Sequence, residues 1–340
     1  LRTYAKALKE TFLELRDAAG EFFNISRGLL AKGRGWREQW RLTTGRTEPG
    51  WEGIEGSLSN LIYLLEQSKK QLLALHDTAE GFGESWLDTP WLSELPYGAS
   101  SFAQLAQAGQ LIVDGDLEAY AIWLSGGEKE PCLWQIAPLS VRQTLAELIY
   151  DDKASMVFTS ATLESKGSFD FFCHGAGLDM AALPVETLRL SHTFDYTSQA
   201  KLFLPNDIPD FTQVTEIEAA QAIAQSLVPL IKEAQGRALI LFTSLTQLRE
   251  VRNLIEVPLM QEGITVLAQG VDGSRESLLY RLQQEERVCL LGSSSFWEGV
   301  DVAGEALSLV IVVRLPFQPV FEPYTAAKLE KIAKEGRDPF

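Results

Sequence analysis

The chain has 340 residues, of which 46% are hydrophobic and 10% aromatic, and its formal net charge is −16. This length predicts about two domains with packed cores. Every apolar run is shorter than the ~18 residues that a membrane-spanning helix needs, which argues against an integral membrane protein.

The three cysteines and three histidines are scattered along the sequence. Cys132, Cys173 and Cys289 lack Cys-x-x-Cys spacing, which indicates thiols in a reducing compartment rather than disulfides or zinc ligands. The histidines are equally isolated, so we predict no metal site. The net negative charge argues against nucleic-acid binding over a broad surface, because phosphate contacts dominate DNA affinity. A protein with an acidic surface can nevertheless bind a strand in a narrow groove.

The first hundred residues are predicted to be mostly helical. Apolar residues near helical spacing predict one amphipathic helix over residues 1–33 and a second from residue 51 to 75, separated by the Gly- and Pro-bearing segment 43–50. Residues 81–101, rich in Trp, Pro and Gly, are predicted to be irregular. A basic stretch from Arg27 to Arg46 is interpreted as a solvated helix end, with nucleic-acid contact as the less favoured alternative.

The middle of the chain predicts short strands and one helix. Strands are expected at residues 119–124 and 132–137, joined by a charged loop, and a helix at 140–149. A further strand at 155–159 is expected to run into a hydroxyl-rich loop.

The last third predicts a parallel sheet. After a helix at 214–234, apolar runs at 238–242, 263–268 and 287–291 each end in a polar loop, with helical sequence between them, and one more run follows at 307–313. This is the rhythm of βαβ units. Because open parallel sheets bind ligands at the carboxyl ends of their strands, the loops after these strands are the candidate site.

Four of these strand–loop segments resemble known motifs. In chain order, Thr159-Ser-Ala-Thr-Leu163, Phe242-Thr-Ser244, Ala268-Gln-Gly270 and Phe296-Trp-Glu-Gly-Val-Asp301 resemble motifs III, IV, IVa and V of superfamily 2 helicases. The last, followed by Arg314-Leu-Pro-Phe317, resembles the bacterial DinG branch of the XPD/DinG group. The resemblance is specific over residues 133–323, and before them it rests on position and helical character.

The resemblance implies an α/β fold, with a RecA-like (P-loop NTPase-type) parallel-sheet domain preceded by a mostly helical arch-like domain. Residues 1–118 would be the arch-like insertion. Residues 119–205 would be a remnant of the first RecA-like domain with motif III and the crossover. Residues 206–340 would be the second RecA-like domain, incomplete at its C-terminus.

The resemblance also assigns roles to the loop residues. Those expected at the ATP cleft or in coupling are Ser160, Thr162, Glu298, Gly299 and Asp301, and those expected to bind DNA are Thr243, Ser244, Gln269, Phe296, Trp297, Arg314 and Phe317. Other interpretations stay open. Asp301 can cap the following turn, Thr243 and Ser244 can cap a helix, and at least one of the two aromatic residues can be buried instead of stacking on a base.

Several motor parts are absent from the sequence. It contains no Gly-Lys-Ser/Thr phosphate cradle, no Asp-Glu-Ala-His box and no Gln-x-x-Gly-Arg-x-x-Arg motif. We therefore expect a piece of a larger helicase, without catalytic residues and without ATPase activity by itself. An iron–sulfur cluster, which needs clustered cysteines, is not supported.

The intact protein is expected to be a cytoplasmic enzyme of DNA repair or replication that hydrolyses ATP with Mg²⁺. It would translocate on single-stranded DNA from 5′ to 3′. Its protein partners are not indicated. The alternative is a non-catalytic module that binds nucleic acid or protein.

Overall fold

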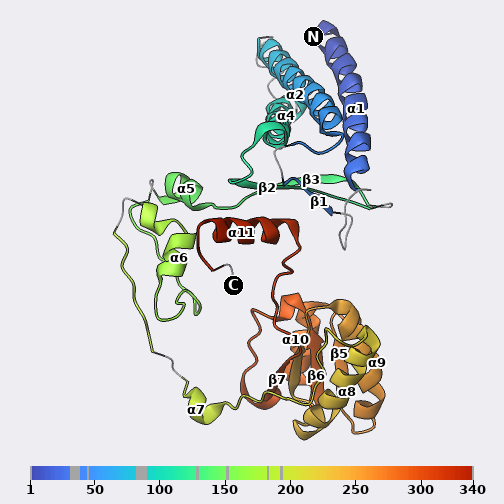
Figure 1. Cartoon of the computed structure of the whole chain (residues 1–340), viewed down its shortest axis with the longest axis vertical. Coiled ribbons are helices and arrows are strands. Elements are labelled where there is room, and N and C mark those ends of the chain that lie inside the picture. Colours follow the sequence, from blue (N-terminus) through green and yellow to red (C-terminus); the bar gives the residue numbers. More distant parts are fainter. Residues whose placement is uncertain are drawn as a thin grey trace. The chain divides into compact units, whose positions relative to one another are not determined.

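The computed structural model describes residues 2–30, 39–43, 46–81, 90–127, 130–150, 153–181, 184–191 and 194–338. The chain forms two compact units (Figure 1). The first unit comprises residues 1–189 and 318–340, and the second comprises residues 190–317. The boundaries predicted at residues 118/119 and 205/206 refer to domains of a whole helicase and stay a prediction.

Three long helices form the upper part of the first unit (Figure 1): α1 (Arg2–Leu30), α2 (Trp51–Glu80) and α4 (Pro90–Asp114). α1 and α2 confirm the two predicted helices, because their apolar positions share one buried core. Leu58, Leu61 and Leu65 of α2 recur at the spacing of one helical face and are all buried there.

The prediction of an irregular segment at 81–101 is wrong for its described part, because α4 begins at Pro90 and continues through Pro96. Proline is tolerated at a helix start, where its missing N–H has no partner to lose. Small residues then bring α4 close to α2. A Cβ on Gly109 would lie 2.8 Å from Cγ1 of Ile62, so glycine is needed at this contact.

A three-stranded antiparallel sheet completes this core, in the order β1 (Gln39–Arg41), β2 (Tyr120–Ser125) and β3 (Leu133–Pro138). The predicted strands at 119–124 and 132–137 are thereby confirmed. α11 (Pro323–Lys334) packs against this sheet, where Arg41 forms an ion pair with Glu330 and Nζ of Lys331 donates to the carbonyl oxygen of Glu118 at 3.1 Å.

The predicted helix at 140–149 is present as α5 (Arg142–Leu145), which continues into a π-helical turn (Ala146–Tyr150). The predicted strand at 155–159 is wrong. This segment has no regular secondary structure, no described strand pairs with it, and Val157 is 86% exposed. A strand requires a neighbour for its backbone hydrogen bonds, and apolar sequence cannot supply one.

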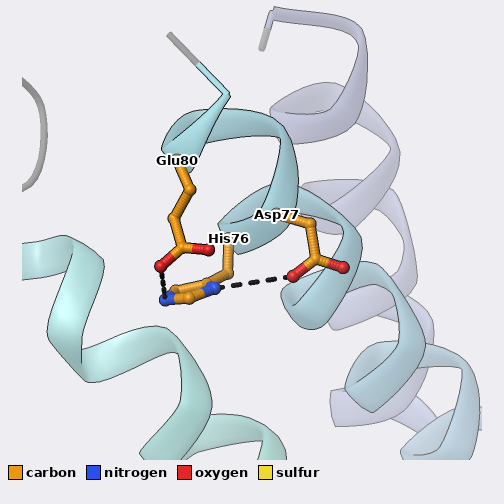
Figure 2. A group of neighbouring side chains, drawn as sticks. All are labelled: His76, Asp77 and Glu80. Carbon is orange, nitrogen blue, oxygen red and sulfur yellow. Dashed lines mark ion pairs between the residues drawn. The ribbon is translucent and has the colours of Figure 1, made fainter. Parts of the chain in front are cut away.

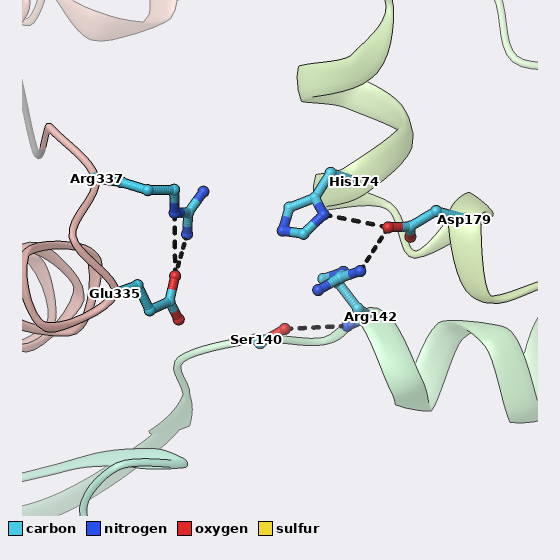
Figure 3. A network of polar contacts seen from close by, with 6 residues as sticks. All are labelled: Ser140, Arg142, His174, Asp179, Glu335 and Arg337. Atoms are coloured by element: carbon cyan, nitrogen blue, oxygen red, sulfur yellow. Dashed lines mark hydrogen bonds and ion pairs between the residues drawn. The ribbon is translucent and has the colours of Figure 1, made fainter.

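The chain then forms α6 (Asp170–Gly175) and a 3₁₀ turn (Leu178–Met180), which a polar network ties to α5 (Figure 3). Asp179 Oδ2 accepts from Nη2 of Arg142 at 2.7 Å and lies 3.2 Å from Nδ1 of His174. The hydrogen bond from Arg142 holds the pKa of Asp179 below its usual value. Glu335 and Arg337, which follow α11, form a separate ion pair facing this network (Figure 3).

The second unit is a parallel α/β layer structure. After α7 (Tyr196–Gln199) come α8 (Glu216–Glu233), β4 (Ala238–Leu241), α9 (Leu245–Met260), β5 (Thr265–Ala268), α10 (Arg275–Gln284), β6 (Val288–Gly292), 3₁₀ turns at Ser294–Phe296 and Gly304–Ala306, and β7 (Leu309–Val312). The sheet order is β5-β6-β4-β7, and all three pairings are parallel. The four strands expected here and the parallel fold class are confirmed.

Alternation along the strands sends side chains to both faces of this sheet. Ile240 and Phe242 of the β4 segment pack with α8 and α9, whereas Leu239 and Leu241 pack with α10. Burial on both faces explains why the strands are continuous apolar runs in the sequence. Thr215 and Glu218 form a reciprocal capping box that starts α8, the helix predicted at 214–234.

Among the described helices, none is both long and apolar enough to cross a membrane.

Candidate functional site

The loops that follow β4, β5 and β6 leave the same edge of the parallel sheet, because parallel strands all end on one side. We call it the carboxyl edge. From β4 the chain passes to β5, beyond β6, whereas from β6 it returns across β4 to β7. The connections after these two adjacent strands therefore run in opposite directions, which is the place where open parallel sheets bind ligands.

Phe296 anchors the loop after β6 in the core. Its side chain is 1% exposed and packs between the sheet and α10. A Cβ on Gly292 would lie 2.6 Å from Cβ of Phe296, so the strand can end here only with glycine. For Phe296 the structure thus shows the burial alternative, and this side chain cannot stack on a base without leaving the core.

Trp297 lies at the rim of the same loop. Its indole Nε1 donates a hydrogen bond to the carbonyl oxygen of Phe242 at 3.2 Å, and the ring is half-buried against the core beneath α10. The bond joins the loop after β6 to the end of β4. These are the two adjacent strands whose connections run in opposite directions. Part of the indole remains exposed at the carboxyl edge.

Glu298, Gly299 and Asp301 are exposed, and their backbone is held by residues that the sequence analysis missed. Arg275, the first residue of α10, donates from Nε to the carbonyl oxygen of Ser295 at 2.9 Å, and from Nη2 to those of Glu298 at 3.2 Å and Gly299 at 2.8 Å. Gly299 adopts a positive φ of 66° that favours glycine.

The carboxylates of this loop remain available. Neither Glu298 nor Asp301 has a side-chain hydrogen bond or ion pair with any described residue. Only their main-chain oxygens are engaged, that of Asp301 by Nε2 of Gln283 at 3.0 Å. The alternative in which the carboxylate of Asp301 caps the following turn is thus not seen in the described part of the chain.

Gln269, at the end of β5, supports the edge from inside. Its Oε1 accepts from the backbone N–H of Ser293 at 2.7 Å, which joins the loop after β5 to the loop after β6. Ser293 is 5% exposed, so without this acceptor its N–H would be buried without a partner. Gln269 therefore positions the neighbouring loop, and its role as a DNA contact stays a prediction.

Thr243 and Ser244 lie at the end of β4, and both are exposed. Ser244 is the N-cap of α9, with its hydroxyl accepting from the N–H of Gln247 at 3.4 Å, as the capping interpretation expects. The hydroxyl of Thr243 has no partner among the residues that the structure describes. Because the residue is exposed, this hydroxyl is available as a donor and an acceptor.

Arg314 and Phe317 follow β7. The guanidinium of Arg314 stacks over the ring of Phe211, 4.6 Å from its centre. One face of the guanidinium is therefore engaged in a cation–π contact within the unit. Phe317 is 81% exposed.

Ser160 and Thr162 belong to the first unit, and the remaining predicted site residues belong to the second. The two hydroxyl oxygens lie 3.1 Å apart, and the N–H of Thr162 donates to the hydroxyl of Ser160 at 3.2 Å. Both side chains bend the exposed segment that follows residues 155–159 into a local turn.

The basic stretch from Arg27 to Arg46 lies partly outside the described residues, because residues 31–38 and 44–45 are not described. Of its described members, Arg46 donates to the carbonyl oxygens of Ile112 at 3.0 Å and Gly115 at 2.6 Å, and Trp40 packs edge-to-face on Trp134. These contacts are structural.

One His/carboxylate cluster lies on the last turns of α2 (Figure 2). Nδ1 of His76 is 3.6 Å from Oδ1 of Asp77, and Nε2 is 3.7 Å from Oε1 of Glu80. The two carboxylates thus lie at opposite nitrogens of the ring (Figure 2). One ligand atom from each residue lies within 4.8 Å of the others, an arrangement that exposed acidic groups commonly show without an ion, so we interpret the cluster as an imidazole beside two carboxylates.

Residues 227–340 match the family of the helicase C-terminal domain. The chain is 33% identical over 238 residues to the 3′–5′ exonuclease DinG of Bacillus subtilis, covering 69% of this chain and 25% of the relative. It is 34% identical over 225 residues to the ATP-dependent DNA helicase YoaA of Haemophilus influenzae (66% and 33%), and 31% identical over 313 residues to that of Escherichia coli (89% and 45%).

The parallel sheet with its loops at one edge is therefore part of a helicase C-terminal domain. Over 66–89% of its length the chain is similar to these DinG and YoaA proteins, in agreement with the resemblance of its motifs to the DinG-like helicases of superfamily 2. It spans between a quarter and just under half of the length of these three relatives.

Proposed function

We propose that this chain supplies the second RecA-like motor domain of an ATP-dependent DNA helicase, and that the carboxyl edge of its parallel sheet contacts ATP and single-stranded DNA. One observation carries the proposal. The exposed side chains of Thr243, Glu298 and Asp301 gather at the edge where parallel sheets bind ligands, while Arg275 and Gln269 fix the loop backbone from inside.

The chemistry of the side chains at this edge indicates which of them suit the nucleotide and which suit the strand. A carboxylate repels phosphate, so Asp301 suits a ribose hydroxyl or a basic side chain. An indole offers a face to any base, so Trp297 suits a strand that is bound without regard to sequence. The hydroxyl of Thr243 can donate to a phosphate oxygen. The side chains of this edge therefore suit both a nucleotide and a strand.

ATP and Mg²⁺ fit this chain only in part. Asp301 and Glu298 are free acceptors at the edge, whereas the sequence holds no Gly-Lys-Ser/Thr segment to bind the phosphates. Bound ATP supplies the free energy that closes and reopens the cleft in such motors. We propose that the 340-residue chain by itself shows no DNA-stimulated ATPase, and that phosphate-release assays with and without single-stranded DNA stay at background.

Variants of Asp301 in the complete gene product test the nucleotide side. Asp301→Ala is expected to cripple ATP turnover while leaving single-strand affinity within a few-fold. Asp301→Asn keeps an acceptor but loses the charge. It restores turnover in part if the carboxylate accepts a ribose hydroxyl, and does not restore it if the carboxylate holds a cation. Unchanged turnover in both variants would remove Asp301 from the site.

Variants of Trp297 test the strand side. Trp297→Ala is expected to weaken single-strand binding by about 1–3 kcal/mol if the ring stacks on a base. Trp297→Phe keeps a ring face but loses the hydrogen bond to Phe242, and so separates stacking from loop support. If Ala and Phe are equally defective, the indole acts by holding the loop. If Asp301 and Trp297 variants fail equally in binding and hydrolysis, the loop is one coupled element.

We further propose that the complete protein translocates from 5′ to 3′, in the cytoplasm, in DNA repair or replication. The resemblance of Phe296-Trp-Glu-Gly-Val-Asp301 to the DinG branch supports this direction. Unwinding of a duplex with a 5′ overhang, compared with a 3′ overhang, tests it. Strand or protein binding without any ATPase in the complete gene product would instead support a non-catalytic module.

A further inference from the structure

The two helices that lead away from the carboxyl edge, α9 and α10, carry four arginines, and three of them are engaged within the unit. Arg252 is paired with Glu256 at 2.9 Å and with Asp272 at 3.3 Å. Arg281 is paired with Glu285 at 2.6 Å. Arg275 donates to three carbonyl oxygens of the loop after β6. Their donors are therefore largely used in holding the fold.

Arg249 is the exception. It is exposed, and within the described part of the chain it has no ion pair and no hydrogen bond. It lies three residues before Arg252, so both arginines share one face of α9. Arg252 pairs with Asp272 in the loop after β5, which shows that this face points toward that loop.

The position of the guanidinium confirms this direction. A Cβ on Gly270 would lie 3.7 Å from Nη2 of Arg249, and no other contact within 4 Å would exist at that point. Gly270 has a positive φ of 74° and an exposed backbone. A free guanidinium thus lies next to an exposed main-chain turn in the loop after β5, at the carboxyl edge.

We infer that Arg249 binds a backbone phosphate of the nucleic-acid strand. This inference rests on the proposed function and adds to it a contact residue outside the recognised motifs. A guanidinium offers several donors in a plane and matches the oxygens of a phosphate. Such a bond is charge-assisted and independent of base sequence. The chain carries a net charge of −16, which repels phosphate groups. An unpaired cation at this edge would offset that repulsion locally.

The test compares Arg249→Ala with a charge-matched control in the complete gene product. Affinity for single-stranded oligothymidylate is measured by fluorescence anisotropy over a series of salt concentrations. Removing one phosphate contact is expected to lower the slope of log affinity against log salt by about 0.7, with a loss of about tenfold in affinity at low salt. Arg249→Lys keeps the charge and is expected to restore most of the slope.

Lys232→Ala is the control, because it removes the same charge at the opposite edge of the sheet, where Lys232 is paired with Glu262 at 2.9 Å. It should leave the slope unchanged. Arg249→Gln repeats the charge removal with a longer side chain, and thermal unfolding verifies that each variant is folded. Equal slopes for wild type, Arg249→Ala and Arg249→Gln overturn the inference and leave the helicase proposal standing. No binding by the wild type overturns both.

Discussion

The two edges of the parallel sheet in residues 190–317 differ in how their polar groups are used. At the amino edge, Lys232 pairs with Glu262, Arg287 donates to the carbonyl oxygen of Glu262 at 2.6 Å, and Arg237 donates to that of Ala234 at 3.0 Å. At the carboxyl edge, the side chains of Thr243, Arg249, Glu298 and Asp301 are exposed and have no partner among the described residues. These three basic side chains of the amino edge are engaged within the unit, whereas the four side chains of the carboxyl edge are available for a ligand.

The carboxyl edge is nevertheless not loose. Arg275, Gln269 and the indole of Trp297 bind its main chain from within, and Phe296 anchors it in the core. Free side chains on a fixed backbone are the arrangement expected of a binding site, since the ligand does not have to order the loop. The supporting residues, the ligand-facing residues and the amino edge should therefore behave differently when they are substituted.

The largest expected effect on stability concerns Phe296. Because its side chain is 1% exposed, Phe296→Ala should lower the free energy of unfolding by about 3–5 kcal/mol. Chemical denaturation measures this loss. Phe317→Ala is the matched control, since Phe317 is 81% exposed and its removal should change stability by less than about 0.5 kcal/mol. A loss below about 1 kcal/mol for Phe296→Ala would mean that this ring is not a core anchor.

A smaller loss is expected for Gln269. Gln269→Ala leaves the buried N–H of Ser293 without its acceptor, which should cost about 1–3 kcal/mol. Gln269→Glu supplies an oxygen at the same place and should recover most of this stability. Denaturation curves of the two variants give the comparison. If the Ala and Glu variants lose equal stability, the bond to Ser293 is not what Gln269 contributes.

The smallest effect belongs to the amino edge. The hydrogen bond from Lys232 holds the pKa of Glu262 below its usual value. The stabilisation is therefore fully present above the unfolded-state pKa of this carboxyl and is lost as the pH falls through its lowered folded-state pKa. Glu262 is exposed and Lys232 is partly exposed, so solvent screens the pair and its contribution is small. The difference in urea midpoint between wild type and Glu262→Gln should be present at neutral pH and vanish in acid. If the difference in urea midpoint grows as the pH falls, the ion pair does not stabilise the fold in the way proposed.

The parallel sheet could be predicted from the sequence because strands buried on both faces are apolar throughout, as at Val288–Gly292. Small polar loops after such runs then locate the carboxyl edge. The same logic failed at residues 155–159, where an apolar run has no neighbouring strand among the described residues. It also failed at α4, where Pro96 and several small residues concealed a helix that packs closely on α2.

The supporting residues of the site could not be predicted in the same way. Arg275 and Gln269 bind main-chain groups that lie far along the sequence and meet them only in the folded sheet. Phe296 and Trp297 are adjacent aromatic residues, and the 3₁₀ turn at Ser294–Phe296 decides that the first is buried and the second lies at the rim. Arg249 lies outside every motif, and only the folded structure distinguishes it from Arg252, Arg275 and Arg281, whose donors are engaged.

Amide hydrogen exchange of the complete gene product, with and without single-stranded oligothymidylate, tests the contrast between the two edges most directly. The account predicts that the strand slows exchange in the loops that contain Thr243, Gly270 and Gly299. Exchange around Gly236 and Arg287 at the amino edge should be unchanged. Protection at the amino edge, or equal protection at both edges, would contradict the claim that binding belongs to the carboxyl edge.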